Sequence, residues 1–302
     1  MIDLHYKKFE DVAGATDLEK YQSLINQSPT GYIVGMNKFN GVFCEYDARG
    51  KCFQTKNNKV WREGFFPADM VEEVDELAGH LAVNLNRPIS IWGELWMPDM
   101  PLATIAGHVS VNRKRLDPEV SELLTYRVFD IFDTFGLAIN FPFWVRAEAL
   151  HSWNDDSNLY ATRVPAGQIR EAATAVESYD YISHKQAGFE GMVYYVGRAT
   201  QLSGTSHEII KRTVTHTAEF ICVGVEFGMH DTKRAGRVAA LSLQDKNGNI
   251  FKVGGGPGMT QDLLESMAGR PPLGKQILIS FKEYSINGVP LRPQFLAVRD
   301  YE

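Results

Sequence analysis

The chain has little cysteine, no long apolar run and no excess of positive charge. Its 302 residues include three cysteines, Cys44, Cys52 and Cys222. They are too few and too scattered for a disulfide framework or a cysteine-ligated metal site. No apolar run approaches the ~20 residues that a membrane span requires, and the first residues lack the apolar core of a secretory leader. We therefore expect a protein of the reducing cytoplasm that does not enter a membrane.

The charge balance argues against a non-specific nucleic-acid coat protein. The formal net charge is −6 at pH 7, although basic residues gather at 113–115, 211–212 and 233–237. Phosphate binding depends on where positive charge lies rather than on its sum, so a local basic face stays possible. With 44% hydrophobic and 23% charged residues, the composition is that of a globular protein. The length predicts two domains or a single large one.

Helices and strands intermix over the first two thirds of the chain, as in an α+β or mixed-sheet enzyme domain. Apolar residues at spacings of three and four predict a helix at 67–85. Two further helices are predicted at 19–27 and 166–178. The strand-like runs are 32–46, 52–56, 89–96, 126–132 and 191–196.

After about residue 215 the pattern changes to short strands separated by turn signals. The predicted strands are 220–227, 238–243, 250–253, 276–281 and 294–299. A helix at 260–268, with Thr260 as its N-cap, lies between the third and fourth strands. This is the pattern of a small OB-type barrel, a fold often used on nucleic acid, although a β-barrel without that role also fits. We predict domains at 1–215 and 216–302, with a short hinge at 213–218.

A lysine and a glycine three residues later lie between two strand-like runs, in the Lys-Phe-Asn-Gly sequence of residues 38–41. Desolvation on both sides would lower the pKa of Lys38 and make its amine a nucleophile. Gly41 would let a backbone or a phosphate come close. Such a pattern occurs by chance in many proteins, and a surface lysine entering a turn is the alternative.

Four further residues of chemical interest lie in or beside apolar strands. Glu94 lies between two tryptophans at alternate positions, and Glu190 begins an apolar run. Lys211 follows two isoleucines, and Phe129 precedes an aspartate. Buried carboxylates are costly unless they are paired, bound to metal or hydrogen-bonded. Lysines clamp phosphate oxygens, glutamates hold Mg²⁺ and aromatic rings stack bases, so the set suits nucleotide phosphoryl chemistry.

In order, these segments resemble the motifs of the covalent nucleotidyltransferases, which are DNA ligases, RNA ligases and mRNA capping guanylyltransferases. The nearest likeness is to compact, bacteriophage-type ATP-dependent DNA ligases. Residues 38–41 are similar to the K-x-D-G nucleophile motif, and residues 93–96 are similar to the D-G-E-L-W segment. Residues 127–131 resemble the adenine-stacking F-D strand, and residues 190–191 resemble the E-G metal motif. Residues 210–213 resemble the K-x-K strand, and residues 291–300 resemble the closing motif, R-x-P-x-F followed by R-x-D-K.

The resemblance implies an α+β nucleotidyltransferase domain, ATP-grasp-like, followed by a C-terminal OB-fold β-barrel. It also implies an enzyme that seals nicks in duplex DNA during repair or replication. Lys38 would attack the α-phosphorus of ATP to give lysyl-AMP, and the AMP would pass to the 5′-phosphate before the 3′-hydroxyl displaces it. Glu190 would hold Mg²⁺, with Glu94 on the ribose or the metal shell. Phe129 would stack on adenine, and Lys211 would contact the α-phosphate.

The same resemblance assigns Arg299 and Asp300 of the OB barrel to the pyrophosphate of ATP during the first step. The barrel would then swing away about its hinge and close around nicked DNA. No protein partner is implied, and we expect a monomer.

The chain departs from the family motifs at several positions. Asn40 replaces the usual aspartate, Phe43 stands where ligases commonly carry arginine, and Thr213 replaces the second lysine of K-x-K. Met36 lacks the carboxylate that often reads the adenine amino group, and the final lysine is missing. Lys56 is a candidate replacement for the arginine of a Ser-Arg motif.

Two other functions fit the same sequence. An RNA ligase is one, because its motifs tolerate variation at the position of Asn40. The other is a degenerate, non-catalytic nucleic-acid-binding protein, which the departures favour and the retained Lys38, Glu94, Glu190 and Lys211 disfavour. A capping enzyme fits less well because residues 93–96 are ligase-like. NAD-dependent ligation is disfavoured because zinc-ligand cysteines and a nicotinamide-binding segment are missing.

Overall fold

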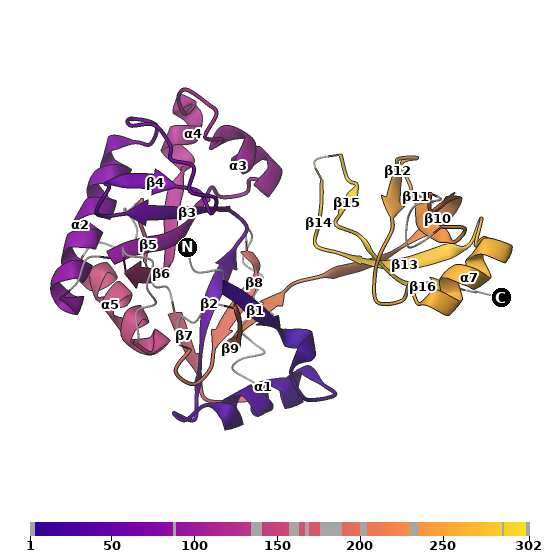
Figure 1. Cartoon of the computed structure of the whole chain (residues 1–302), viewed down its shortest axis with the longest axis horizontal. Helices are drawn as coiled ribbons and strands as arrows, with labels where there is room; N and C mark the ends of the chain where they lie inside the picture. The colour runs from indigo at the N-terminus through magenta and orange to yellow at the C-terminus, as the bar shows by residue number, and fades with distance from the viewer. Residues whose placement is uncertain are drawn as a thin grey trace. The chain divides into compact units, whose positions relative to one another are not determined.

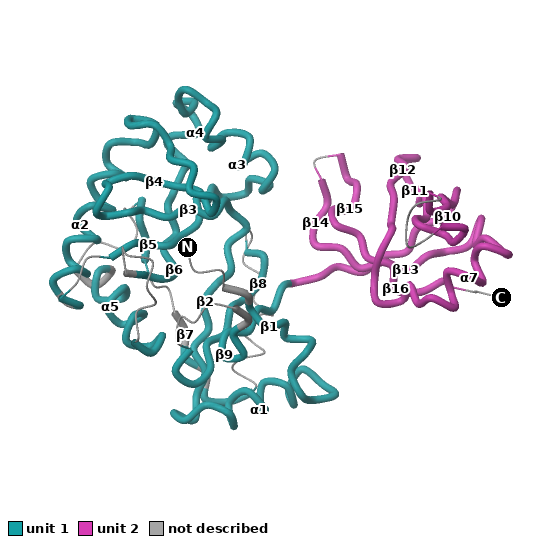
Figure 2. The backbone as a smooth tube through the Cα atoms, viewed as in Figure 1, with its two compact units in different colours: residues 1–213 teal, residues 214–302 magenta. Residues whose placement is uncertain are grey.

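The computed structural model divides the chain into two compact units, residues 1–213 and 214–302 (Figure 2). The division lies two residues before the predicted boundary. The structure describes residues 4–86, 89–133, 141–156, 163–166, 169–175, 189–199, 204–229, 235–285 and 287–299. Within these ranges, no helix is both long and apolar enough to span a bilayer.

The first unit contains two sheets, and the first of them has five strands in the order β1-β9-β8-β2-β7 (Figure 1). All of its neighbouring strands are antiparallel except β1 and β9, which are parallel. Helix α1 packs on one face through Tyr21, Leu24 and Ile25, which are buried with residues of β2, β8 and β9. The strands are β1 (Leu4–Lys8), β2 (Ile33–Phe39), β7 (Ile169–Ala172), β8 (Phe189–Tyr195) and β9 (Gly204–Thr213), and the helices are η1 (Phe9–Asp11) and α1 (Asp17–Gln27).

The second sheet of this unit has four antiparallel strands in the order β4-β3-β5-β6. Its largest core forms where α2 buries Met70, Val74, Leu77 and Leu81 with residues of β3, β5 and β6. Burial of this apolar stripe explains why spacings of three and four predicted the helix. The strands are β3 (Val42–Asp47), β4 (Cys52–Gln54), β5 (Ile89–Trp96) and β6 (Thr125–Asp133), and the helices are α2 (Ala68–Leu85), α3 (Leu102–His108), α4 (Pro118–Leu123) and α5 (Phe143–Asp156).

The predicted strand at 32–46 is two strands in different sheets, β2 and β3, and the chain crosses between them at residues 40 and 41. Glycine is required at this crossing. A Cβ on Gly41 would lie 2.5 Å from the backbone oxygen of Leu95 on β5. The crossing fixes Lys38 near the end of β2, where the two sheets meet.

One predicted helix is wrong. Within 166–178, residues Ile169–Ala172 form strand β7, which pairs with β2, and residues 176–178 lie outside the described part of the chain. Pairing with a strand more than 130 residues away overrides the local preference of a short segment. The sequence pattern also missed β1 and helices α3 to α5. The three cysteines are free, with Cys44 and Cys222 buried.

The second unit is a five-stranded antiparallel sheet in the order β12-β11-β10-β13-β16, with helix α7 and a small hairpin beside it. The five strands and the helix match the predicted elements. The side chain of Thr260 caps α7 by accepting a hydrogen bond from the backbone N–H of Leu263. The elements are β10 (His216–Phe227), β11 (Val238–Gln244), β12 (Ile250–Val253), α7 (Gln261–Gly269), β13 (Gln276–Phe281), β14 (Glu283–Tyr284), β15 (Pro290–Leu291) and β16 (Gln294–Arg299).

A glycine-rich segment after β12 joins the two edge strands of this sheet. The backbone N–H of Phe295 on β16 donates to the oxygen of Gly255 at 2.8 Å, and the N–H of Gly258 donates to the oxygen of Phe295 at 3.2 Å. A Cβ on Gly258 would lie 1.9 Å from the backbone oxygen of Leu296. The glycines therefore allow this segment to approach β16 closely.

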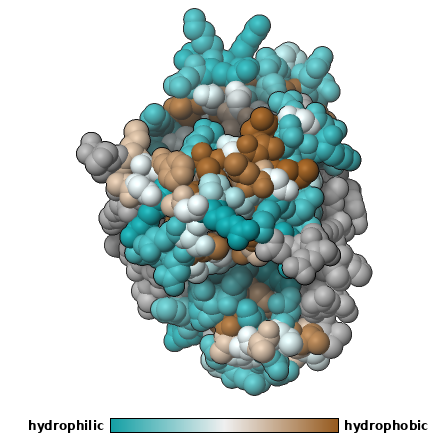
Figure 3. All heavy atoms as spheres, turned by 90° about the vertical axis from the view of Figure 1, so that its right-hand side faces the viewer, coloured by the Kyte–Doolittle hydropathy of each residue, from teal (hydrophilic) through white to brown (hydrophobic). Residues whose placement is uncertain are grey.

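Apolar side chains also lie on the outer face of β10. Exposed and buried residues alternate along this strand: Ile221 and Val223 are exposed, and Phe220 and Cys222 are buried. Figure 3 shows apolar side chains gathered on the face of the molecule that it presents.

Candidate active site

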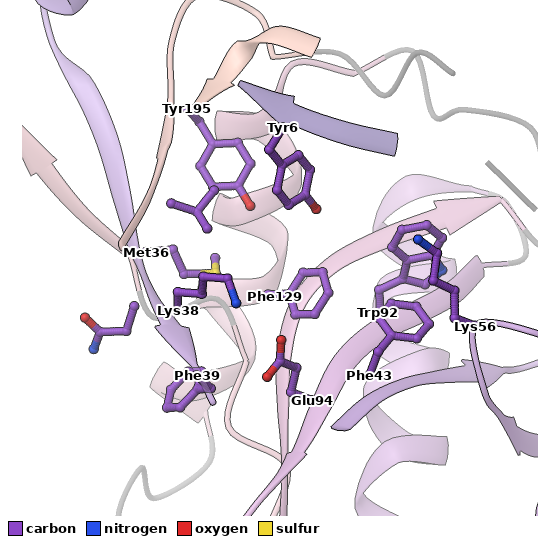
Figure 4. A pocket seen from close by; sticks show the side chains of 12 residues that line it. Tyr6, Met36, Lys38, Phe39, Phe43, Lys56, Trp92, Glu94, Phe129 and Tyr195 are labelled. Atoms are coloured by element: carbon purple, nitrogen blue, oxygen red, sulfur yellow. The ribbon is translucent and has the colours of Figure 1, made fainter. Parts of the chain in front are cut away.

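The two sheets of the first unit enclose a cavity of about 270 Å³. This volume is close to the lower end of the range for small-molecule sites, ~300–1,000 Å³. Lys38, Glu94 and Phe129, which the sequence predicted as site residues, all line it (Figure 4). The lining side chains come from β1, β2, β3, β5, β6 and β8 and from the loop after β4, and are Tyr6, Met36, Asn37, Lys38, Phe39, Phe43, Lys56, Trp92, Glu94, Phe129, Val193 and Tyr195.

Lys38 forms an ion pair with Glu190, whose Oε2 accepts a hydrogen bond from the ammonium group. Strand pairing brings the two together, because Lys38 on β2 lies opposite Gly191 on β8. The side chain of Lys38 is 22% exposed and that of Glu190 is 14% exposed. Lys38 is therefore half-buried and paired, rather than desolvated without a partner. The amine must exchange this partner and lose a proton before it can act as a nucleophile.

Glu94 is the second carboxyl group at this end of the cavity. Its Oε2 accepts a hydrogen bond of 2.8 Å from the backbone N–H of Gly41. Burial raises the pKa of Glu94 to about 7, against the lowering effects of Lys38 and of the Gly41 N–H, and the charge of Glu190 raises it further. Near neutral pH the group is thus poised between its acid and its carboxylate form.

Phe129 on β6 forms one wall of the cavity, and Met36 lies across it on the other sheet (Figure 4). Val193 lines the cavity from the sheet of Met36. Met36 and Val193 are directly paired across β2 and β8, so their side chains share one face. An aromatic wall opposite an aliphatic wall suits a flat ring between them. The geometry thus agrees with a base-stacking role for Phe129.

Lys211 lies on β9 opposite Val193 of β8. Paired residues of neighbouring strands point to the same side of a sheet, which places Lys211 on the cavity face. Lys211 does not itself line the cavity. The next residue of its motif, Thr213, pairs with Gly191, which in turn pairs with Lys38. Thr213 is thus in line with the nucleophile position, where the family motif has a second lysine.

The remaining predicted site residues belong to the second unit. Arg299 lies on β16, and its Nε is 3.4 Å from Oε1 of Glu219 on β10. Asp300 lies outside the described residues. The roles of both residues stay predictions.

Sequence reasoning missed a buried ion pair behind the cavity wall. Asp130 follows Phe129 on β6, and its carboxylate accepts hydrogen bonds from Arg146 of α5 at 2.7 Å and 3.1 Å. Arg146 is fully buried and donates further to the backbone oxygen of Phe141 at 2.6 Å. An aspartate in an apolar strand was the available signal, but its partner in a helix could not be identified from the sequence. The pair ties α5 to the strand that carries Phe129.

Phe43 and Lys56 lie along another side of the cavity. Phe43 contacts Trp92 edge-on at a centroid distance of 5.2 Å and Phe129 at 6.3 Å. An aromatic cluster thus occupies the place where ligases commonly carry an arginine. Lys56 lines the cavity beside this cluster (Figure 4).

The donor set fits Mg²⁺ in the manner of nucleotide-dependent enzymes. Mg²⁺ is usually held by one or two carboxylates, with waters and substrate phosphates completing the octahedron. Glu190, which pairs with Lys38, and Glu94, whose pKa responds to the charge of both, supply such carboxylates. Within the described residues there is no group of three His, Cys, Asp or Glu that would hold a metal without substrate.

The chain is similar in fold to known proteins. Residues 231–299 match the family model of the DNA ligase OB-like domain. A structure from work on Lig E DNA ligases aligns with a TM-score of 0.65 and 19% identity, covering 99% of this chain and 100% of its own. The ATP-dependent DNA ligase of bacteriophage T7 in complex with ATP aligns with a TM-score of 0.53 and 15% identity, covering 98% of each chain.

A further structure, designated Pmar-Lig_Pre, aligns with a TM-score of 0.71 and 14% identity, covering 100% of this chain and 68% of its own. No curated protein sequence matches the chain significantly. The predicted fold class is confirmed, since the chain has the fold of ATP-dependent DNA ligases, a nucleotidyltransferase domain followed by an OB domain.

Proposed function

We propose that this protein is an ATP-dependent DNA ligase that seals nicks bearing a 5′-phosphate and a 3′-hydroxyl. One observation carries the proposal. Lys38 pairs with the carboxylate of Glu190 and, together with Glu94, lines a cavity whose walls suit a flat ring. The ligase fold of both units supports the same function. ATP would be the activating nucleotide and nicked duplex DNA the substrate.

In the first step, the Nζ of Lys38 attacks the α-phosphorus of ATP, a P–N bond forms, and pyrophosphate leaves. The ammonium of Lys38 must first give up a proton, and the carboxylate of Glu190 is the group beside it. Glu190 and Glu94 would hold Mg²⁺, whose charge would offset that of the phosphates. Phe129 on one wall, with Met36 and Val193 on the other, would hold the base.

In the later steps, AMP passes from Lys38 to the 5′-phosphate of the nick, and the 3′-hydroxyl then displaces it. Lys211, on the cavity face of β9, is the proposed contact to the α-phosphate. Arg299 and Asp300 remain our proposed groups for pyrophosphate in the first step. We also propose that the protein works as a cytoplasmic monomer.

The experiment is a sealing assay on a labelled nicked duplex with Mg²⁺ and either ATP, GTP or NAD. We expect sealing with ATP and none with NAD. Lys38→Ala should fail on a nick with a 5′-phosphate. The same variant should still seal a nick that already carries 5′-linked AMP, which shows that it is folded and binds DNA.

Two outcomes would replace the proposal. Sealing of nicked RNA but not of nicked DNA would identify an RNA ligase, which variation at Asn40 permits. Tight binding of nicked DNA with no sealing of either nick, including the pre-adenylated one, would identify a non-catalytic nucleic-acid-binding protein. The departures at Phe43 and Thr213 are the observations that favour this last reading.

A further inference from the structure

Two tyrosines line the part of the cavity that lies across Phe129 from Glu94 (Figure 4). Tyr6 of β1 and Tyr195 of β8 both line it, and their hydroxyl groups point inward toward Phe129 (Figure 4). Neither residue was singled out by the sequence, because β1 comes from the N-terminus and reaches the cavity by pairing with β9.

The strand register gives the distance of Tyr195 from the nucleophile. Along β2, Lys38 pairs with Gly191, Met36 with Val193, and Val34 with Tyr195. Four residues of strand span about 13 Å. The base-holding pair, Met36 and Val193, lies halfway. A nucleotide with its α-phosphate at Lys38 and its base beside Phe129 would therefore present the outer edge of that base to the tyrosines.

The two hydroxyl groups are available for a ligand. Within the described part of the chain, neither one has a hydrogen-bond partner. The neighbouring Tyr194, on the opposite face of β8, differs in this respect because its hydroxyl is 2.9 Å from that of Tyr21. Tyr195 is only 6% exposed, and its ring stacks on Phe143 at a centroid distance of 3.3 Å, so its direction is fixed.

Both phenols stay protonated at physiological pH. Burial is the main cause that raises the pKa of Tyr6 and of Tyr195, and the carboxylate of Asp130 raises both further. Each group therefore offers a neutral hydroxyl, which can donate one hydrogen bond and accept others.

We propose that Tyr6 and Tyr195 read the edge of the nucleobase, and that the pocket accepts both 6-amino and 6-oxo purines. The inference rests on the proposed function and names the specificity residues of that site. Met36 occupies the position where the resemblance places a carboxylate, and its thioether is only a weak acceptor. A carboxylate only accepts, and so selects an amino group. A hydroxyl rotates to suit either an amino or an oxo group.

The expected discrimination follows from this difference. A site built to hydrogen-bond one group rejects an analogue that lacks it by about 10⁴-fold or more. Two rotating hydroxyls leave no unpaired group with either purine, so we expect ATP and GTP to differ by less than about 100-fold.

The test measures the rate of covalent labelling of the full chain by α-labelled ATP and GTP at subsaturating concentration. The variants are Tyr6→Phe and Tyr195→Phe, and the control is Tyr284→Phe, a half-exposed tyrosine of the second unit. Each cavity variant should lose about 5- to 10-fold with both nucleotides, the effect of one neutral hydrogen bond. Tyr284→Phe should label as the wild type does. Thermal unfolding of each variant checks that the loss is not one of folding.

Two results would overturn the inference, namely a preference for ATP above about 100-fold, or unchanged labelling of both cavity variants. Failure of the proposed function looks different, because no nucleotide would then label the wild type. In that case, equilibrium binding of AMP and GMP to the unlabelled protein tests whether the pocket accepts both purines. The inference predicts similar affinities that both fall in Tyr195→Phe, and binding of AMP alone would contradict it.

Discussion

Glu94 and Lys38 line one cavity, and the charges of Lys38 and Glu190 both act on the pKa of Glu94. The ion pair of Lys38 and Glu190 leaves Glu94 as the carboxyl group whose pKa is raised to about 7. A charged substrate or Mg²⁺ entering this site would favour the ionised form of Glu94, so ligand binding and proton release are coupled there.

Glu94→Gln should change the pH dependence of stability. Because the pKa of Glu94 is higher in the folded protein than its ordinary value of 4.5, the folded state holds its proton more tightly. The stabilisation is present below pH 4.5 and is lost as the pH rises through 7. Between pH 5 and 8, the melting temperature of the wild type should fall by about 5 to 10 °C relative to that of Glu94→Gln.

The control for this experiment is Glu72→Gln, on an exposed position of α2. Its melting temperature should follow that of the wild type at every pH. Parallel curves for Glu94→Gln and the wild type would show that Glu94 titrates normally and that the site is more open to water than the structure indicates.

At the scale of residues, the sequence predicted those side chains that stand in recognisable motifs. Lys38, Glu94 and Phe129 line the cavity, and Glu190 contacts Lys38. Tyr6, Tyr195 and Arg146 could not be found in this way, because they reach the site through strand pairing and helix packing between distant parts of the chain. Hydrophobic periodicity gives the face of a strand but not its neighbour.

At the scale of elements, the crossing from β2 to β3 explains why glycine stands at position 41. A Cβ there would lie 2.5 Å from the oxygen of Leu95 and 3.1 Å from Oε2 of Glu94. The Gly41 N–H also donates to Glu94. Gly41 therefore allows the close approach of β5 and places Glu94. From the sequence, Gly41 could have served the approach of either a backbone or a phosphate, and the structure shows the approach of a backbone.

Gly41→Ala should lower the free energy of unfolding by about 1 to 3 kcal/mol, because the added methyl group must push β5 away. Sealing should fall at least about 10-fold, since Glu94 moves with the strand. Gly79→Ala is the matched control. Its Cβ meets nothing within 4 Å on α2, so it should stabilise the helix by about 0.5 to 1 kcal/mol. Equal stability of the two variants in urea would refute this account of Gly41.

The ion pair of Asp130 and Arg146 holds α5 against β6. Removal of one partner leaves a buried charge uncompensated, so Asp130→Asn should cost about 3 to 5 kcal/mol. The double variant Asp130→Asn with Arg146→Met should cost clearly less, because the buried charge is gone. Chemical denaturation of both variants measures the difference. A double variant as unstable as the sum of its single variants would mean that packing, not charge, governs this contact.

Several elements were predictable because their cause is local. The helix at residues 68–85 follows from its apolar stripe, and the start of α7 follows from its capping threonine. Strand β7 was mistaken for a helix because its structure depends on pairing with β2. The strand predicted at 32–46 was not divided, because nothing local to Asn40 and Gly41 marks a change of sheet.

At the scale of the whole molecule, each unit has its own hydrophobic core. The buried clusters of the first unit share no residue with the cluster of the second, which includes Phe220, Leu241 and Phe295. Units with separate cores unfold separately unless a large interface couples them. The five strands of the second unit were predictable from turn signals. The backbone hydrogen bonds of Gly255 and Gly258 to Phe295 were not, because glycines mark turns and close approaches alike.

Gly258→Ala should therefore destabilise the second unit alone, because its Cβ would lie 1.9 Å from the oxygen of Leu296. In hydrogen exchange of the full chain, the β16 amides should exchange faster, because their free energy of opening falls by about 2 kcal/mol. Amides of β2 should be unaffected. Gly269→Ala, whose Cβ meets nothing within 4 Å, is the control. Equal loss of protection in both units would show that they unfold together.

The most direct test of the account is whether Lys38 becomes covalently bound to AMP. The full chain is incubated with α-labelled ATP and Mg²⁺, and the labelled residue is identified by peptide mass spectrometry. We predict a label on Lys38 that acid releases and alkali does not, and none on Lys38→Ala or Lys38→Arg. An unlabelled wild type, or full labelling of Lys38→Ala, would contradict the proposed ligase mechanism.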